Sequence, residues 1–199
     1  TFSNNTAGGG GAIYNIAGSE CFVQNSRCIN NTATSANGGA MWNAGSSPAM
    51  VNCLFSGNTA VYGGAISNSY YQQNADAIVF SSTFVNNSAE YGGAIYHDGA
   101  TQDQLVVYQC NFNTNTANKS GGAIYSNLNT LFSVGCIYNG NSAIQNGGAV
   151  YLLTASGLTE YIHDSYVVNN TASGSGGGIY MIDNGVLSLN NAVLANSRA

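Results

Sequence analysis

The sequence predicts an all-β protein, a parallel β-helix solenoid of about seven to eight coils with 25–29 residues in each coil. Three observations lead to this fold class. A Gly-Gly-Ala motif recurs, an Asn-Ser/Thr-Ala motif recurs in phase with it, and short runs of Val, Ile, Phe and Tyr lie between them. Self-similarity at a period of roughly 20–50 residues is the signature of a solenoid or a related array.

The Gly-Gly-Ala motif sets the period. Its third position falls at Ala12, Ala40, Ala65, Ala94, Ala123, Ala149 and Gly178, with spacings of 28, 25, 29, 29, 26 and 29 residues. The glycines supply turn conformations that other residues resist. The next residues are aliphatic and are expected to stack in the core: Ile13, Met41, Ile66, Ile95, Ile124, Val150 and Ile179.

The Asn-Ser/Thr-Ala motif predicts a column of stacked amides. Asn suits a turn because it tolerates left-handed conformations, and stacked Asn side chains can bond along the axis as an amide ladder. The expected ladder comprises Asn5, Asn31, Asn58, Asn87, Asn115, Asn141, Asn170 and Asn196. Three residues before each Asn lies an apolar residue: Phe2, Cys28, Phe55, Phe84, Phe112, Tyr138, Val167 or Val193.

The residues between the motifs indicate strands. Helical repeats need amphipathic stretches of ten or more residues, which Gly-Gly pairs and Asn clusters interrupt here. Runs such as 77–80 and 104–108 are apolar, β-branched or aromatic, and turn residues bound them. A WD40 propeller needs a longer period, and the Leu ladder of leucine-rich repeats is missing. One repeat per coil of a parallel β-helix fits best.

A stripe of aromatic residues follows the aliphatic column at Tyr14, Trp42, Tyr96, Tyr125, Tyr151 and Tyr180. Neighbouring strand residues point to opposite faces, so an inward aliphatic column places this stripe outside. There it could bind sugar rings or another protomer, or serve only to stack coil on coil. A kink at the glycine pair would bury it instead.

The paired motifs resemble the FxxN and GGA(I/L/V) repeats of the polymorphic outer membrane protein family, first known from chlamydiae. FxxN is matched outright at Phe2–Asn5, Phe55–Asn58, Phe84–Asn87 and Phe112–Asn115, and the resemblance covers essentially the whole chain. It implies a right-handed parallel β-helix that is surface-exposed and serves in adhesion. The expected location is therefore extracellular or at the cell surface.

Composition narrows the partners. The chain of 199 residues has three Lys and Arg against eight Asp and Glu, so nucleic-acid binding, which needs clustered cations, is excluded. No apolar run approaches the length of a transmembrane helix. We expect one β-helix domain over residues 1–199, as part of a longer solenoid or as a stacking protomer. Its expected partners are other copies, end to end or laterally, or a cell-surface glycan or protein.

Two kinds of modification are candidates. Sequons for N-glycosylation occur at Asn4, Asn30, Asn86, Asn118 and Asn169, although an Asn-Asn-Thr-Ala repeat creates sequons automatically. Of the five cysteines, Cys110 and Cys136 would neighbour each other on adjacent coils, and Cys21 and Cys28 could form a local bridge. A buried stack of free thiols is an equal alternative for the first pair.

Enzyme chemistry has few candidates. The long arms of the repeats, at residues 67–76, 97–104 and 154–164, are expected to be loops that are solvated or bind a partner. They carry His97, Asp98 and Asp103, and His163 beside Asp164, which could meet on one face. No zinc or calcium motif is present, so we expect no metal, cofactor or catalytic residue.

The sequence thus favours a non-enzymatic structural rod, adhesin-like or a subunit of an extracellular filament. The alternatives are a carbohydrate-binding or carbohydrate-active β-helix of the polysaccharide lyase or hydrolase kind, and an ice-binding β-helix.

Overall fold

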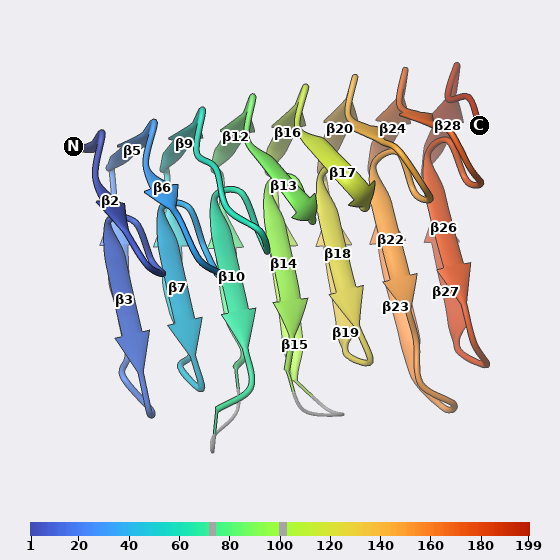
Figure 1. Ribbon diagram of the computed structural model, residues 1–199. Helices are drawn as coiled ribbons and strands as arrows, with labels where there is room; N and C mark the ends of the chain where they lie inside the picture. The colour runs from blue at the N-terminus through green and yellow to red at the C-terminus, as the bar shows by residue number, and fades with distance from the viewer. Residues whose placement is uncertain (72–74, 100–102) are drawn as a thin grey trace.

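The computed structural model describes residues 1–71, 75–99 and 103–199. The described part of the chain forms 28 strands and no helix, and these strands wind into the coils of a parallel β-helix (Figure 1). The chain advances steadily along the axis, so its two ends lie at opposite ends of the rod. None of the described segments is a helix that could cross a membrane.

Three sheets run along the rod. Sheet 1 contains β1 (Phe2–Ser3), β5 (Arg27–Ile29), β9 (Leu54–Ser56), β12 (Thr83–Val85), β16 (Asn111–Asn113), β20 (Ile137–Asn139), β24 (Tyr166–Val168) and β28 (Val193–Ala195). Sheet 2 contains β3 (Ile13–Ile16), β7 (Met41–Ala44), β10 (Ile66–Ser69), β14 (Ile95–Asp98), β18 (Ile124–Asn127), β22 (Val150–Leu153) and β26 (Ile179–Ile182). Sheet 3 contains β4 (Phe22–Gln24), β8 (Ala49–Val51), β11 (Ala77–Phe80), β15 (Gln104–Tyr108), β19 (Thr130–Val134), β23 (Thr159–His163) and β27 (Val186–Asn190).

Short strands join sheet 1 to sheet 2. They are β2 (Thr6–Ala7), β6 (Thr32–Ala33), β13 (Ser88–Tyr91), β17 (Thr116–Ser120), β21 (Ser142–Ala143) and β25 (Thr171–Ala172). Neighbouring strands pair in parallel and keep the sequence repeats in register, so that Ile66 lies between Met41 and Ile95. The predicted parallel β-helix is therefore confirmed, with seven strands in each of sheets 2 and 3.

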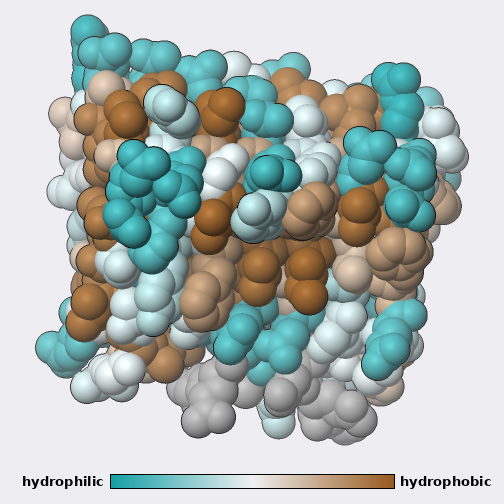
Figure 2. Space-filling view, turned by 180° about the vertical axis from the view of Figure 1, so that it is seen from behind, coloured by the Kyte–Doolittle hydropathy of each residue, from teal (hydrophilic) through white to brown (hydrophobic). Residues whose placement is uncertain are grey.

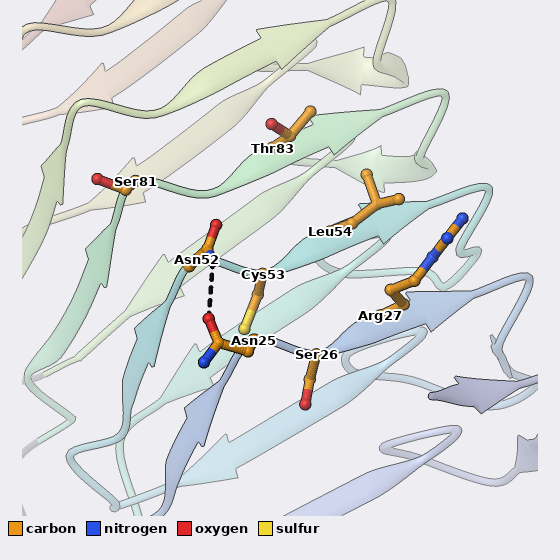
Figure 3. A pocket seen from close by; sticks show the side chains of 8 residues that line it. All are labelled: Asn25, Ser26, Arg27, Asn52, Cys53, Leu54, Ser81 and Thr83. Atoms are coloured by element: carbon orange, nitrogen blue, oxygen red, sulfur yellow. Dashed lines mark hydrogen bonds between the residues drawn. The ribbon is translucent and has the colours of Figure 1, made fainter.

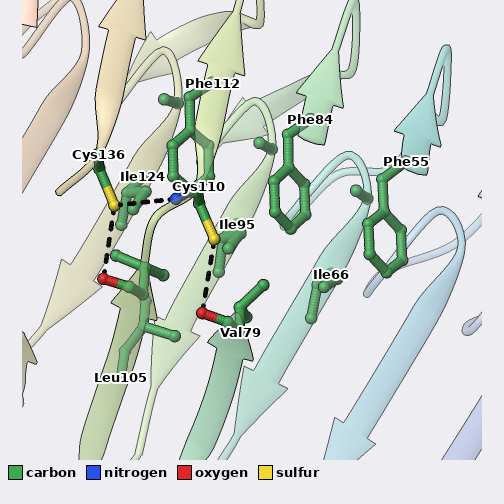
Figure 4. Packing of buried hydrophobic residues seen from close by; sticks show 14 of the residues in the cluster. Phe55, Ile66, Val79, Phe84, Ile95, Leu105, Cys110, Phe112, Ile124 and Cys136 are labelled. Atoms are coloured by element: carbon green, nitrogen blue, oxygen red, sulfur yellow. Dashed lines mark hydrogen bonds between the residues drawn. The ribbon is translucent and has the colours of Figure 1, made fainter. Parts of the chain in front are cut away.

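Buried side chains from all three sheets fill the interior, and Figure 4 shows part of this core. The aliphatic column of sheet 2 is fully buried from Met41 to Val150. Opposite it, the column of sheet 1 stacks Phe55, Phe84, Phe112 and Tyr138 with ring centroids 4.8–4.9 Å apart. This spacing equals the distance between strands, so each ring covers the next without a gap.

The amide ladder runs beside the Phe column. The Nδ2 of Asn58 donates to Oδ1 of Asn87 at 2.9 Å and to the carbonyl oxygen of Cys28 at 3.0 Å. The backbone N–H of Asn58 also donates to Oδ1 of Asn87, at 3.0 Å. The same pattern continues through Asn115, Asn141 and Asn170. Each interior amide thus has both its N–H groups and both lone pairs occupied, which burial requires.

The last member of the expected ladder is wrong by one residue. Val167 pairs with Leu194 rather than with Val193, so the equivalent of Asn170 is Ser197. The backbone N–H of Asn170 donates to Ser197 Oγ at 3.3 Å. Asn196 precedes the ladder position and has a φ of 54°, like Asn169 in the coil before it. The final copy carries its Asn at the left-handed turn position and a hydroxyl in the ladder.

The two glycines of the pair have different tasks. Gly63 has a φ of +64°, which a side chain would resist. Gly64 lies so close to the next coil that a Cβ would collide with the carbonyl oxygen of Gly93. The first glycine therefore turns the chain, and the second lets neighbouring coils approach each other.

The loops predicted at residues 67–76, 97–104 and 154–164 are shorter in the structure, because parts of these segments are strands. Ser67 and Asn68 belong to β10, His97 belongs to β14, and Glu160 belongs to β23, and all four side chains are fully buried. Residues 72–74 and 100–102 of these arms lie outside the described residues. The long arms therefore hold strands of the core as well as their connections, since sheet 3 is built from them.

Sheet 3 lies behind sheet 2 in Figure 1, and its outer side is partly apolar. Phe22, Ile78, Phe80 and Tyr108 are exposed on it. Figure 2, which views the rod from behind, shows hydrophobic side chains among polar ones across the middle of the molecule.

Candidate functional site

The aromatic stripe lies on the outer side of sheet 2. The strand register brings Tyr14 beside Trp42, and Tyr96 beside Tyr125, Tyr151 and Tyr180 in turn. Ring centroids are 4.6 Å apart in the first pair and 5.4, 4.5 and 5.2 Å apart along the second series. Ser67 occupies the place between the two groups. Tyr14 is exposed and the other five rings are half-buried, so the stripe both stacks and presents ring edges to solvent.

A second, shorter stack lies beside the first and was missed at the sequence level. Tyr62 and Tyr91 each precede a glycine pair, and their rings stack at 5.7 Å. Tyr62 lies 4.9 Å from Tyr96 at an interplanar angle of 53°, and Tyr91 lies 5.3 Å from Tyr125 at 73°. Two ring stacks inclined to each other form a trough that follows the rod axis. The four rings line a hollow of about 230 Å³. We call this group the tyrosine trough.

A polar hollow of about 250 Å³ continues from the tyrosine trough and is lined by Asn37, Tyr62, Ser69, Tyr96 and Asp98. The Tyr96 hydroxyl donates to Asp98 Oδ2 at 3.2 Å, and Asn127 Nδ2 donates to Asp98 Oδ1 at 2.7 Å. Trp42 Nε1 donates to Ser69 Oγ at 2.9 Å. These bonds fix the carboxylate and the indole beside the rings.

The phenol groups of Tyr96 and Tyr125 stay protonated, because their pKa values are raised. Burial raises the pKa of Tyr96 above its ordinary value, and the negative charge of Asp98 raises it further. Burial also raises the pKa of Tyr125, with a contribution from Tyr151. Lys119 closes one side, because its Nζ lies 2.8 Å from Glu90 Oε2 and 4.8 Å from the centre of the Tyr91 ring. The trough thus places the neutral hydroxyls of Tyr96 and Tyr125 between the carboxylate of Asp98 and the ion pair of Lys119 with Glu90.

Such a surface suits a polyhydroxylated ligand. Ring faces and edges cover the apolar C–H patches of a sugar, while phenol, amide and carboxylate groups exchange hydrogen bonds with its hydroxyls. Binding sites for small ligands combine apolar walls with a few polar groups in this way.

The structure does not bring the candidate catalytic residues together. His97 is fully buried and points into the rod, whereas its neighbour Asp98 points outward to the trough. Asp103 is buried and accepts a hydrogen bond from the backbone N–H of Ala75 at 3.0 Å. Asp164 is exposed at a turn after β23, where it accepts from Asn191. Successive side chains of one strand face opposite ways, which separates His97 from Asp98.

The five cysteines are free thiols in the structure, so neither the Cys110–Cys136 nor the Cys21–Cys28 bridge is present. The Cys110 thiol donates to the carbonyl oxygen of Val79, and the Cys136 thiol donates to that of Val107. Both sulfurs therefore bond toward backbone in the preceding coil. Cys28 lies in the Phe column of sheet 1, and burial raises the pKa of its thiol to about 12.

All five sequon asparagines are exposed: Asn4, Asn30, Asn86, Asn118 and Asn169. Four of them, all but Asn118, occupy left-handed turn positions with φ between 53° and 58°. Gly57 and Gly140 take the same place in other coils, with φ near +65°. Backbone conformation by itself therefore favours Asn at these four positions.

Comparison with known protein families explains the repeat. The family model described as the Chlamydia polymorphic membrane protein repeat matches residues 1–16, 52–69, 81–98, 109–127 and 164–181. The chain carries repeats of this polymorphic membrane protein kind, called Pmp-like repeats below. Each matched segment runs from a strand of sheet 1, through the ladder Asn and the glycine pair, to a strand of sheet 2. The matched segments therefore supply four residues of the stripe, Tyr14, Tyr96, Tyr125 and Tyr180, while Trp42, Tyr151 and the strands of sheet 3 lie outside them. No curated protein and no solved structure matches the chain.

Proposed function

We propose that the protein is a surface-exposed β-helix of the outer-membrane-protein kind that serves in adhesion, without catalysis, by contacting carbohydrate through the tyrosine trough. The Pmp-like repeats support the surface location. The trough supports the ligand class, because inclined stacks of Tyr62, Tyr91, Tyr96 and Tyr125 form a hollow beside the fixed carboxylate of Asp98.

The rod geometry also favours an extended ligand. The rings of the stripe repeat at about the spacing of the strands, so the stripe continues from the trough along the axis to Tyr151 and Tyr180. A chain of sugar units lying along the rod would meet an equivalent ring in successive coils. Weak contacts repeated in this way add up, as they do in multivalent binding.

The test is binding of the purified chain to a glycan array, followed by titration of the best neutral glycan. Replacing Tyr62 and Tyr96 by Ala should lower affinity at least tenfold. The matched control is Tyr108→Ala, which removes an exposed aromatic ring from sheet 3 and should leave affinity unchanged. Circular dichroism serves to check that the variants remain folded. Equal binding by the double variant, or no binding to any glycan, would overturn the proposal.

A further inference from the structure

A separate hollow lies at the corner where sheet 3 passes into sheet 1. It has a volume of about 430 Å³ and spans the first three coils. Figure 3 shows Asn25, Asn52 and Ser81 along one side, Arg27, Leu54 and Thr83 along the other, and Cys53 between them.

The backbone makes this corner concave. Asn25, Asn52 and Ser81 have φ values of 49°, 52° and 48°, so the chain turns sharply at the same place in each coil. Arg27, Leu54 and Thr83 then begin the strands of sheet 1 in register with one another. The two rows form the walls of the hollow, and its floor is the turn between them.

Charge distinguishes this hollow from the rest of the surface. The chain has a net charge of −5, yet no carboxylate lines the hollow. Among the described residues Lys119 forms the one ion pair, with Glu90, so the exposed guanidinium of Arg27 has no carboxylate partner there. A planar guanidinium is suited to bind a carboxylate with two parallel hydrogen bonds.

The other polar groups suit hydroxyls. Asn52 Nδ2 donates to Asn25 Oδ1 at 2.7 Å, which holds the two amides side by side. Because that bond uses one amide hydrogen and one oxygen, Asn25 keeps its Nδ2 donors and Asn52 keeps its Oδ1 acceptor. Ser81 and Thr83 add two hydroxyls. This set of a cation, amides and hydroxyls is suited to an anion that also carries hydroxyl groups.

We propose that this hollow binds a carboxylate-bearing sugar residue. The guanidinium of Arg27 binds the carboxylate, and the amides of Asn25 and Asn52 bind ring hydroxyls. The site is independent of the tyrosine trough, which lies on sheet 2. The failure of either proposal would therefore leave the other intact.

The experiment is an NMR titration of the full chain with an oligosaccharide that contains glucuronic acid. A second probe is the same oligosaccharide with its carboxylates reduced to hydroxymethyl groups, and a third is acetate. We expect shifts at Asn25, Arg27 and Asn52 with the acidic sugar, and at least tenfold weaker binding of both other probes.

Two variants of Arg27 test separately the positive charge of its side chain and the planar geometry of the guanidinium. Arg27→Gln should weaken binding of the acidic sugar at least tenfold, and Arg27→Lys should recover only part of that loss. The control is Arg198→Gln, because Arg198 is an exposed arginine in the last coil. This variant should bind the acidic sugar as tightly as the unmodified chain does. Equal binding of acetate would reduce the hollow to a simple anion site and overturn the proposal. So would equal affinity for the reduced oligosaccharide, or binding that survives Arg27→Gln.

Discussion

Asn68 and His97 lie opposite each other on neighbouring strands of sheet 2, and an inner amide ladder ends between them. Asn15 Nδ2 donates to Asn43 Oδ1, and Asn43 Nδ2 donates to Asn68 Oδ1, both at 2.7 Å. Among the residues that the structure describes, Asn68 Nδ2 and both ring nitrogens of His97 are buried without a hydrogen-bond partner. This second ladder was not predicted from the sequence.

Replacing His97 by Asn should therefore stabilise the rod. The new Oδ1 can accept from Asn68 Nδ2, which satisfies a buried donor worth about 1–3 kcal/mol. Thermal unfolding should show a higher melting temperature for His97→Asn. His163→Asn, on the outer side of sheet 3, is the control and should change little. A His97→Asn variant less stable than the unmodified protein would contradict the ladder argument.

His97 should also make the stability of the protein depend on pH. Burial lowers the pKa of His97 from 6.5 to about 3, so the folded protein keeps the imidazole neutral while the unfolded chain takes up a proton. The contribution of neutral His97 to the free energy of unfolding is therefore complete above pH 6.5. It is lost progressively as the pH falls toward 3. Urea unfolding at a series of pH values should show this loss, and His97→Asn should flatten it.

Glu160 has the opposite dependence. Burial raises the pKa of its carboxyl from 4.5 to about 6, although Leu131 N–H and Thr154 Oγ1 donate to it. Its stabilising contribution is therefore complete below pH 4.5 and is lost as the pH rises through 6. Glu160→Gln should raise the free energy of unfolding at pH 7 by up to about 2 kcal/mol. The gain should vanish near pH 4.5, whereas Glu20→Gln, at an exposed site, should show no such pattern.

The amide ladder that runs beside the Phe column should not tolerate the loss of one of its members. Asn87→Ala would leave the N–H groups that Asn58 donates to it without an acceptor, and would free the carbonyl oxygen of Phe55. We expect a loss of about 3 kcal/mol or more in the free energy of unfolding. Asn86→Gly is the matched control, because Gly57 and Gly140 already occupy that column. Similar losses in the two variants would refute a specific role for the ladder.

Gly64 tests the close approach of the coils. Gly64→Ala places a methyl group against the backbone of Gly93 and Ser88, which cannot move without displacing the next coil. We expect this variant to lose about 3 kcal/mol or more, or to fail to fold. Gly140→Asn should be tolerated, because its left-handed position accepts Asn in other coils and a Cβ there meets Thr114 at an ordinary 3.5 Å. Soluble, fully stable Gly64→Ala protein would show that the spacing can relax.

The regular part of this molecule could be predicted because every coil repeats the same physical problem. A column of seven aliphatic residues and a column of asparagines are visible by phase alone. The errors fell where one copy departs from the repeat. The last copy is offset so that Ser197, not Asn196, reaches the ladder. The inner ladder was missed because only three coils carry its Asn, and the same column continues from His97 as Ser126, Leu152 and Met181.

The tyrosine trough was harder to foresee. Tyr62 and Tyr91 recur in only two coils, and Asn37 and Ser120 take their place in neighbouring ones. Tyr62 and Tyr91 also lie on short connections between sheet 1 and sheet 2, and three-dimensional packing sets the angle of these connections to sheet 2. The common offset of one residue before a glycine pair was the available signal, and it placed the two rings in one column but not against Tyr96 and Tyr125.

The ladder has a consequence for how such rods change length. Each amide accepts from the Asn of the coil before it, donates to a backbone carbonyl of that coil, and donates to the amide oxygen in the coil after it. Removing one whole period, such as residues 58–86, would bring Asn31 against Asn87 with every bond re-formed. Interactions confined to nearest neighbours make the number of coils a variable that deletion or duplication can reset. The reach of the molecule can thus evolve separately from the chemistry of its faces.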